Sequence, residues 1–214
     1  MSLIRRGVAR WQRMPPAPTP RDSAADSVLA LSDTHRLVQP AAQTSGPAVL
    51  TMMRMCGDDA FCTSIATAPD PPAAFAAAAA ATVQQTNAFR DRSGQLQLPW
   101  RGDTRPAALI RDLGRGWHNR VIDPGHREFA YDVIVTYSEA GWLIPLYVGD
   151  GSWMQHTVLV MGADADALRV YEPRHGTVVE RDRDAFAAGR LDLGGWHEPW
   201  LFILPGERPG HRFA

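Results

Sequence analysis

The sequence predicts an α+β fold in which an N-terminal helical lobe packs on a C-terminal antiparallel sheet. Two observations lead to this class. Alanine-rich and capped helical patterns fill the first half of the chain, and short apolar runs separated by turn residues fill the second half. This segregation favours α+β over a doubly wound parallel sheet. With 214 residues the chain is long enough for one sizeable domain.

The first half contains an extended lead and then a series of helices. Residues 1–30 are rich in Arg, Pro and Ala and are expected to form a weakly ordered lead, so the single folded domain spans 31–214. Ser45 stands at or just before the start of a helix that Gly57 ends, because proline is tolerated in a first turn and glycine favours a stop. Further helices are expected at 58–65, at 73–89 with Asp70 as its cap, and at 106–113 with Thr104 as its cap.

The second half reads mainly as strands. Expected strands are 117–122, 142–148, 156–161, 168–171, 177–180 and 200–204, with helices at 127–140 and 183–188. Pro145 indicates an edge strand or a bulge. If the turn between strands 156–161 and 168–171 is centred on Asp164 and has no bulge, His156 lies directly opposite Glu172 in an antiparallel hairpin. Cross-strand Cβ atoms are then about 5 Å apart, which is close enough for an imidazole–carboxylate hydrogen bond.

Composition excludes several classes of function. The formal net charge of −1 gives no bulk attraction to nucleic acid or to an anionic membrane. No secretory signal and no membrane-spanning window is present, so we expect a cytoplasmic protein. Cys56 and Cys62 lack histidines at ligand spacing and are expected to be small packing residues. We therefore expect no metal and no cofactor.

A set of polar residues has the composition of a nucleophilic site. Ser45 at a helix N-terminus lies where free N–H groups favour an anion or a thiolate. Glu172 would orient the ring of His156 and raise its pKa, and the Gln39 amide is six residues upstream of Ser45. A base oriented by a third group, next to a hydroxyl or thiol, is the layout of nucleophilic catalysis. Two simpler interpretations stay open, in which Ser45 only caps its helix and His156 makes a structural bond at a strand end.

These motifs resemble those of a known family. The papain-like cysteine peptidases of the bacteriocin-processing type, which trim double-glycine leader peptides, carry a Gln, then Cys-Gly-Pro-Ala opening a helix, then a Gly-His-Tyr-Val-Val-Val-like strand followed by Asp-Pro or Asn-Pro. The matching positions here are Gln39, 45–48, 155–160 and 172–173, and 141–148 resembles the family's strand before the histidine.

The resemblance implies a papain-like fold and attack on a peptide, amide or thioester carbonyl. Ser45 would be at the nucleophile position, His156 would be the base and Glu172 its orienter, and Gln39 would stabilise the oxyanion with the Ser45 N–H. The residues expected to contact a peptide or protein substrate are Gly46, Trp153 and Gln155.

Two departures from the family pattern matter for activity. Glu172 replaces Asp or Asn and is one methylene longer. Ser45 replaces the cysteine, and a hydroxyl cannot form the thiolate–imidazolium pair, so His156 would have to act as a true general base. The chain is then an introduced Cys-to-Ser form, a natural pseudoenzyme or, least favoured, a working serine variant. It would be a cysteine-peptidase-like hydrolase if the native residue 45 is cysteine.

Two other classes of function stay open. In one, the chain is a catalytically dead module that holds a peptide or protein in the same cleft. In the other, the resemblance is accidental and the chain is an α+β interaction domain.

Overall fold

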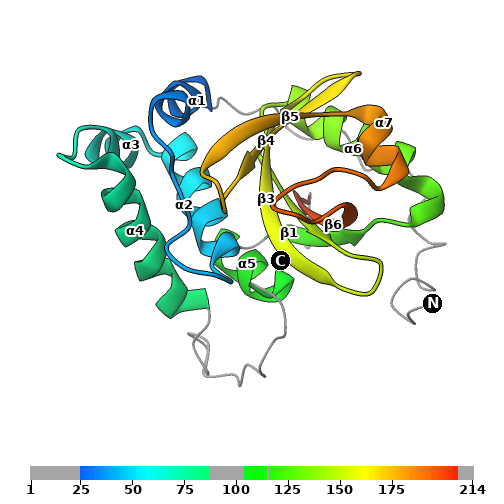
Figure 1. The fold of residues 1–214 in the computed structure, drawn as a ribbon, viewed down its shortest axis with the longest axis horizontal. Coiled ribbons are helices and arrows are strands. Elements are labelled where there is room, and N and C mark those ends of the chain that lie inside the picture. The colour runs from blue at the N-terminus through cyan, green and yellow to red at the C-terminus, as the bar shows by residue number, and fades with distance from the viewer. Residues whose placement is uncertain (1–24, 87–103, 115, 207–214) are drawn as a thin grey trace, which may run out of the picture.

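The chain folds as the α+β class predicts, with helices first and an antiparallel sheet after them (Figure 1). The computed structural model describes residues 25–86, 104–114 and 116–206. In the described part of the first half the helices are α1 (Ala25–Thr34), α2 (Ser45–Gly57), α3 (Asp59–Ala66), α4 (Pro71–Thr86) and α5 (Pro106–Leu113).

The second half forms one six-stranded sheet and two helices longer than a single turn. Its strand order is β1-β6-β2-β3-β4-β5, and every neighbouring pair is antiparallel. The elements are β1 (Trp117–Val121), the 3₁₀ turn η2 (Pro124–His126), α6 (Arg127–Glu139), β2 (Ile144–Gly149), β3 (Met154–Ala163), β4 (Ala167–Glu172), β5 (Thr177–Asp182), α7 (Arg183–Ala188) and β6 (Glu198–Pro205).

The sheet has apolar cores on both of its faces, because successive residues of a strand point to opposite faces. Leu159 and Met161 of β3 pack with the methionines of α2 in one core. Val158 and Val160 pack with α6 and α7 in the other. Figure 1 shows α2 lying between α4 and the sheet, with α6 and α7 beyond the sheet. Helix α2 is therefore buried along most of its length, and its first residue meets the sheet.

Most of the predicted elements are present, and several predictions need correction or lie outside the described residues. Helix α5 is preceded by Arg105 as its N-cap residue rather than by Thr104. Pro145 lies in β2, which is an interior strand. It is tolerated because the ladder with β6 starts only at the next residue, Leu146. The end of the predicted helix 73–89 and residues 1–24 of the predicted lead lie outside the described residues, and α1 begins before the predicted boundary at residue 30.

The predicted hairpin register is wrong, because β3 contains a bulge. Val160 pairs with Val170, but Gly162 pairs with Arg169, so Met161 is an extra residue on β3. The turn is also centred beyond Asp164, whose N–H bonds the carbonyl of Ala167. Extending this register places Val158, and not His156, across from Glu172. The glutamate and the histidine are thus diagonal neighbours.

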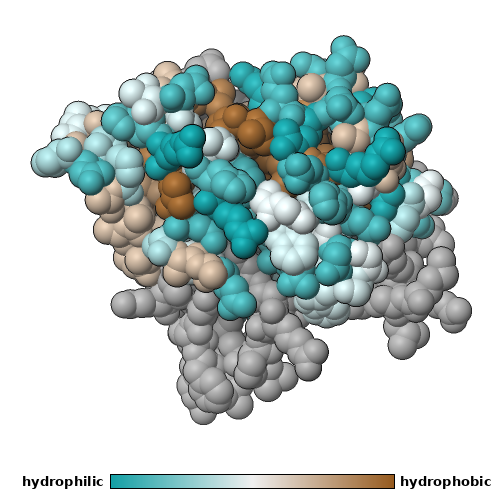
Figure 2. All heavy atoms as spheres, in the orientation of Figure 1, coloured by the Kyte–Doolittle hydropathy of each residue, from teal (hydrophilic) through white to brown (hydrophobic). Residues whose placement is uncertain are grey.

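Across the described residues no helix combines the length and the apolar character that a membrane span needs. Figure 2 shows a face covered mainly by hydrophilic residues, with hydrophobic residues gathered in small areas. Val38 is the large hydrophobic side chain most exposed among the described residues.

Candidate active site

Ser45 is the first residue of α2 and lies against the sheet. Its side chain is fully buried, and its Oγ accepts a hydrogen bond of 2.8 Å from the backbone N–H of Thr157 in β3. The β3–β4 ladder begins only at Leu159, so the hydroxyl takes the place of a strand partner for this N–H. Thr44, and not Ser45, is the N-cap residue of α2. The capping interpretation of Ser45 is therefore wrong, and the serine joins the helix to the strand that carries His156.

His156 and Glu172 form a buried hydrogen-bonded pair. The Nε2 of His156 lies 2.6 Å from Oε1 of Glu172, and the two side chains are 6% and 3% exposed. The longer glutamate reaches the diagonal position that the bulge at Met161 creates. A second bulge places the histidine itself, because Val148 pairs with His156 while Gly149 pairs with Met154. Gln155 is the extra residue.

The Glu172 carboxylate accepts four hydrogen bonds. Oε1 accepts from His156 Nε2 and from the N–H of Arg174 at 2.9 Å, and Oε2 accepts from the N–H of His175 at 3.0 Å and from its ring Nδ1 at 2.5 Å. Burial raises the pKa of Glu172, but the hydrogen bonds from His156, Arg174 and His175 and the attraction to His156 outweigh it and lower this pKa to about 2. The carboxylate is thus ionised at neutral pH and only accepts. In a neutral ring, His156 then carries its proton on Nε2 and leaves Nδ1 as a base.

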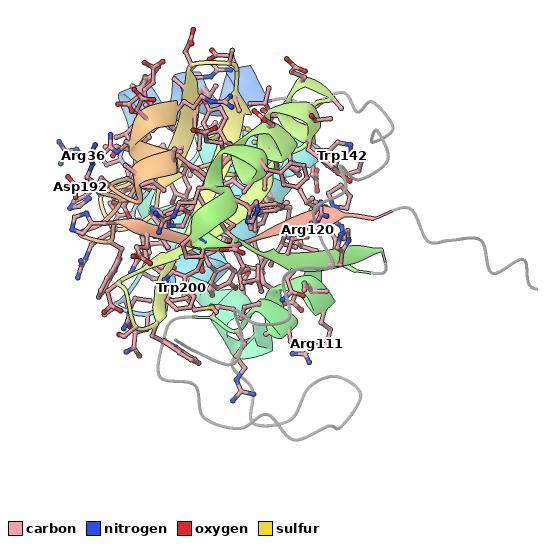
Figure 3. All side chains as sticks on the ribbon, turned by 90° about the vertical axis from the view of Figure 1, so that its right-hand side faces the viewer. Arg36, Arg111, Arg120, Trp142, Asp192 and Trp200 are labelled. Atoms are coloured by element: carbon pink, nitrogen blue, oxygen red, sulfur yellow. The ribbon has the colours of Figure 1, made fainter. Side chains whose placement is uncertain are left out.

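A tight turn covers the pair. Gly194 has a φ of +62°, and a Cβ atom at this position would lie 3.0 Å from Glu172 Oε1 and 3.1 Å from His156 Nε2. The guanidinium of Arg174 donates to the carbonyl of Gly194 at 2.7 Å. The turn therefore shields the imidazole–carboxylate bond from water, and a Cβ atom at position 194 would press on both side chains. Figure 3 labels Asp192, two residues before Gly194, and shows it near Arg36 at one edge of the molecule.

Gln39 comes near the pair through its backbone. Its N–H donates to the carbonyl of Pro173 at 2.8 Å, so the segment before α2 docks on the turn after Glu172. Its side-chain Nε2 donates to the carbonyl of Ala41 at 2.7 Å, and its buried Oε1 has no partner among the described residues. The amide is engaged within its own loop, so its role at an oxyanion stays a prediction.

The three predicted substrate-contacting residues lie in different surroundings. Gly46 is buried, and a Cβ atom there would lie 2.3 Å from Cβ of Thr104, so Thr104 fills the space beside it. Trp153 is partly buried against a cluster that includes Tyr147 and Trp200. Gln155 is half-buried at the bulge next to His156. Their contacts to a substrate stay predictions.

Within the described part of the chain, no group of three or more His, Cys, Asp or Glu side chains is arranged to hold a metal ion. Cys56 is buried and Cys62 is half-buried, and both are free thiols. Burial and the charge of Asp59 raise the pKa of the Cys62 thiol.

Sequence reasoning missed three residues of this site, which are Arg174, His175 and Gly194. The adjacent glycines at 194–195 are a turn signal of the kind found in tight hairpins. Nothing in the sequence says which side chains such a turn would cover.

Comparison with known proteins gives structural neighbours. No protein-family model and no curated protein matches the chain. The peptidase domain of Streptococcus ComA, a bifunctional ABC transporter involved in a quorum-sensing pathway, is similar with a TM-score of 0.41 and 15% identity over 80% of this chain and 99% of that one. The peptidase domain of Streptococcus mutans ComA is similar in its complex with a small-molecule inhibitor, with a TM-score of 0.34 and 17% identity over 59% of this chain and 93% of that one. The same domain is similar in a second structure, with a TM-score of 0.33 and 16% identity over 60% and 89% of the two chains. At this level of similarity no activity passes from those proteins to this chain.

Proposed function

We propose that this chain is a papain-like domain of the double-glycine leader peptidase type, with a hydrolase-type site whose nucleophile position is Ser45. One observation carries the proposal. The Oγ of Ser45 binds the N–H of Thr157, and the ring of the preceding residue, His156, is bonded to the ionised Glu172. The N-terminus of α2 is thus bonded to the strand residue next to an oriented imidazole, across a sequence separation of 112 residues.

The chemistry follows from the tautomer of His156. With its Nε2–H donated to Glu172, the ring offers Nδ1 to take a proton from the group at position 45. That group attacks a peptide, amide or thioester carbonyl and forms a tetrahedral oxyanion. The N–H of residue 45 and the amide of Gln39 are the oxyanion donors, which requires Gln39 to exchange its bond to Ala41 for one to the substrate.

Residue 45 decides the rate. A serine hydroxyl has no accessible anion at neutral pH, whereas a cysteine at the same place would be stabilised as a thiolate by the α2 N-terminus and by the Thr157 N–H. We therefore infer that the chain with Ser45 is an inactivated or pseudoenzyme form of a cysteine-dependent frame.

A second candidate is a catalytically dead module that binds a peptide or protein in the same cleft. The full burial of Ser45 favours it, because a nucleophile must meet its substrate. In this candidate the serine only joins α2 to β3.

The test is the thiol created by Ser45→Cys. We expect its pKa, measured from thiolate absorbance against pH, to lie well below the value of about 8.5 for a free cysteine, and to return toward that value in Ser45→Cys/His156→Ala. The parent chain, with Cys56 and Cys62, is the baseline that is subtracted. Absorbance does not require a reagent to reach the buried site.

A second measurement gives the reactivity of the new thiol. The protein is labelled with iodoacetamide at pH 6, and the labelling rate of each cysteine is obtained from its peptide. Cys62 is the internal reference because its pKa is raised. A position-45 thiol with an ordinary pKa and no faster labelling than Cys62 would reject the hydrolase frame and leave the binding module.

A further inference from the structure

The carboxylate of Glu172 is shared between two imidazoles in opposite surroundings. His156 lies on Oε1 and is 6% exposed at its side chain, while His175 lies on Oε2 and is 63% exposed. Because the carboxylate is ionised, both rings donate to it, His156 through Nε2 and His175 through Nδ1.

The length of the glutamate side chain explains why the His175 ring helps to fix the Glu172 carboxylate. Its terminal torsion is broad, so a carboxylate on this longer side chain is not fixed by its rotamer alone. The N–H groups of Arg174 and His175 each hold one oxygen, at 2.9 and 3.0 Å. The His175 ring adds the shorter bond of 2.5 Å on Oε2 and so opposes rotation that would take Oε1 away from His156.

The backbone keeps His175 in this position. Residues 172–176 form a turn in which the N–H of Gly176 bonds the carbonyl of Glu172 at 2.9 Å, and Leu37 in turn bonds the carbonyl of Gly176. Gly176 has a φ of +65°, and a Cβ atom there would lie 2.7 Å from the backbone of Leu37. The turn is therefore pinned on the segment before α2, and its exposed histidine is presented to Glu172 rather than to solvent alone.

We propose that His175 is a positioning residue, which fixes the Glu172 carboxylate so that its other oxygen orients His156. The inference rests on the proposed function, in which His156 is the base. In this role the exposed His175 side chain, at a hairpin turn, helps to set the tautomer and the orientation of the buried His156 ring.

The experiment reads the His156 ring directly by NMR in ¹⁵N-labelled full chain with Ser45 in place. We expect the Nε2–H of His156 to be a slowly exchanging proton. In His175→Ala its resonance should move toward that of a free imidazole, and its exchange with solvent should accelerate about tenfold, the factor for loss of about one hydrogen bond. His175→Asn keeps a side-chain N–H donor for Oε2 and should restore most of the parent resonance.

His126→Ala is the matched control. His126 is also an exposed histidine three residues from a carboxylate, with its Nδ1 3.3 Å from Asp123 Oδ2, and among the described residues no hydrogen bond or ion pair links either side chain to His156. Its removal should leave the His156 resonance unchanged. A parent-like His156 signal in His175→Ala, or no recovery in His175→Asn, would overturn the positioning role.

The two proposals fail separately. The NMR signal is read with Ser45 in place and the thiol pKa is read in Ser45→Cys. An ordinary thiol pKa in Ser45→Cys, with the His175 effect still present in the Ser45 chain, rejects the hydrolase frame and leaves the coupling of the two rings. A low thiol pKa in Ser45→Cys that is the same in Ser45→Cys/His175→Ala rejects the positioning role and leaves the hydrolase frame.

Discussion

The two halves of the site are held in different ways. On the hairpin side, the carboxylate of Glu172 binds two rings and two backbone N–H groups, and the Gly194 turn closes over it. On the helix side, the hydroxyl of Ser45 meets the sheet through the N–H of Thr157. His156 and Glu172 are thus held by polar contacts that do not involve the side chain at position 45. The chemistry that we propose for the site therefore depends on the one side chain at position 45.

The largest expected effect tests this difference directly. Glu172→Ala leaves the donors of His156, Arg174 and His175 without their acceptor and should lower the free energy of unfolding by roughly 3–5 kcal/mol. Ser45→Ala leaves the Thr157 N–H without its serine acceptor and should cost roughly 1–3 kcal/mol. Urea unfolding at pH 7 measures both. Equal losses would contradict the view that the hairpin side is the more firmly held.

Acid should weaken the hairpin side in a defined range of pH. The pKa of Glu172 is lowered from 4.5 to about 2 in the folded chain, so its contribution to stability is present above about pH 4.5 and is lost as the pH falls toward 2. Allowing for screening at the open side of the turn, we expect a loss of about 2 kcal/mol.

The comparison for this acid effect is Glu172→Gln, which cannot titrate at that position. Asp150 and Asp164, whose pKa values are also lowered, are common to both chains, so their effects cancel in the difference. Urea unfolding between pH 7 and 2.5 gives the two slopes. Parallel stability curves would mean that Glu172 is not ionised in the way the four hydrogen bonds imply.

A smaller loss of stability tests whether the turn at Gly194 and Gly195 packs against the His156–Glu172 pair. Gly194 and Gly195 both have positive φ, at +62° and +88°, so alanine should cost about 1 kcal/mol of strain at either. Only at position 194 does the added Cβ meet the His156–Glu172 pair; at 195 the nearest atom is 4.0 Å away on Arg174. Gly194→Ala should therefore lose about 1 kcal/mol more.

Thermal unfolding compares the two glycine variants, and the His156 Nε2–H resonance gives a second measure. We expect this resonance to move in Gly194→Ala and to stay in Gly195→Ala. Identical behaviour of the two variants would show that the turn does not press on the pair.

The sequence by itself determined the α+β class and most helix and strand positions. It also predicted a contact between His156 and Glu172, but from a strand register that is wrong. These follow from local signals: capped helical patterns, apolar runs and a turn between two strands. The α2 helix is an example, since Gly46-Pro47 and Gly57 mark both its ends.

Only the tertiary structure decided how the residues of the site meet. The bulge at Met161 shifts the hairpin register, and the longer glutamate makes the contact diagonally. A bulge is set by what the two strand faces pack against, α2 on one side and α6 on the other, and no short pattern in the sequence records that. The same holds for Ser45, whose hydroxyl meets Thr157 at a sequence separation of 112 residues, and for the turn that places Gly194 over the buried pair.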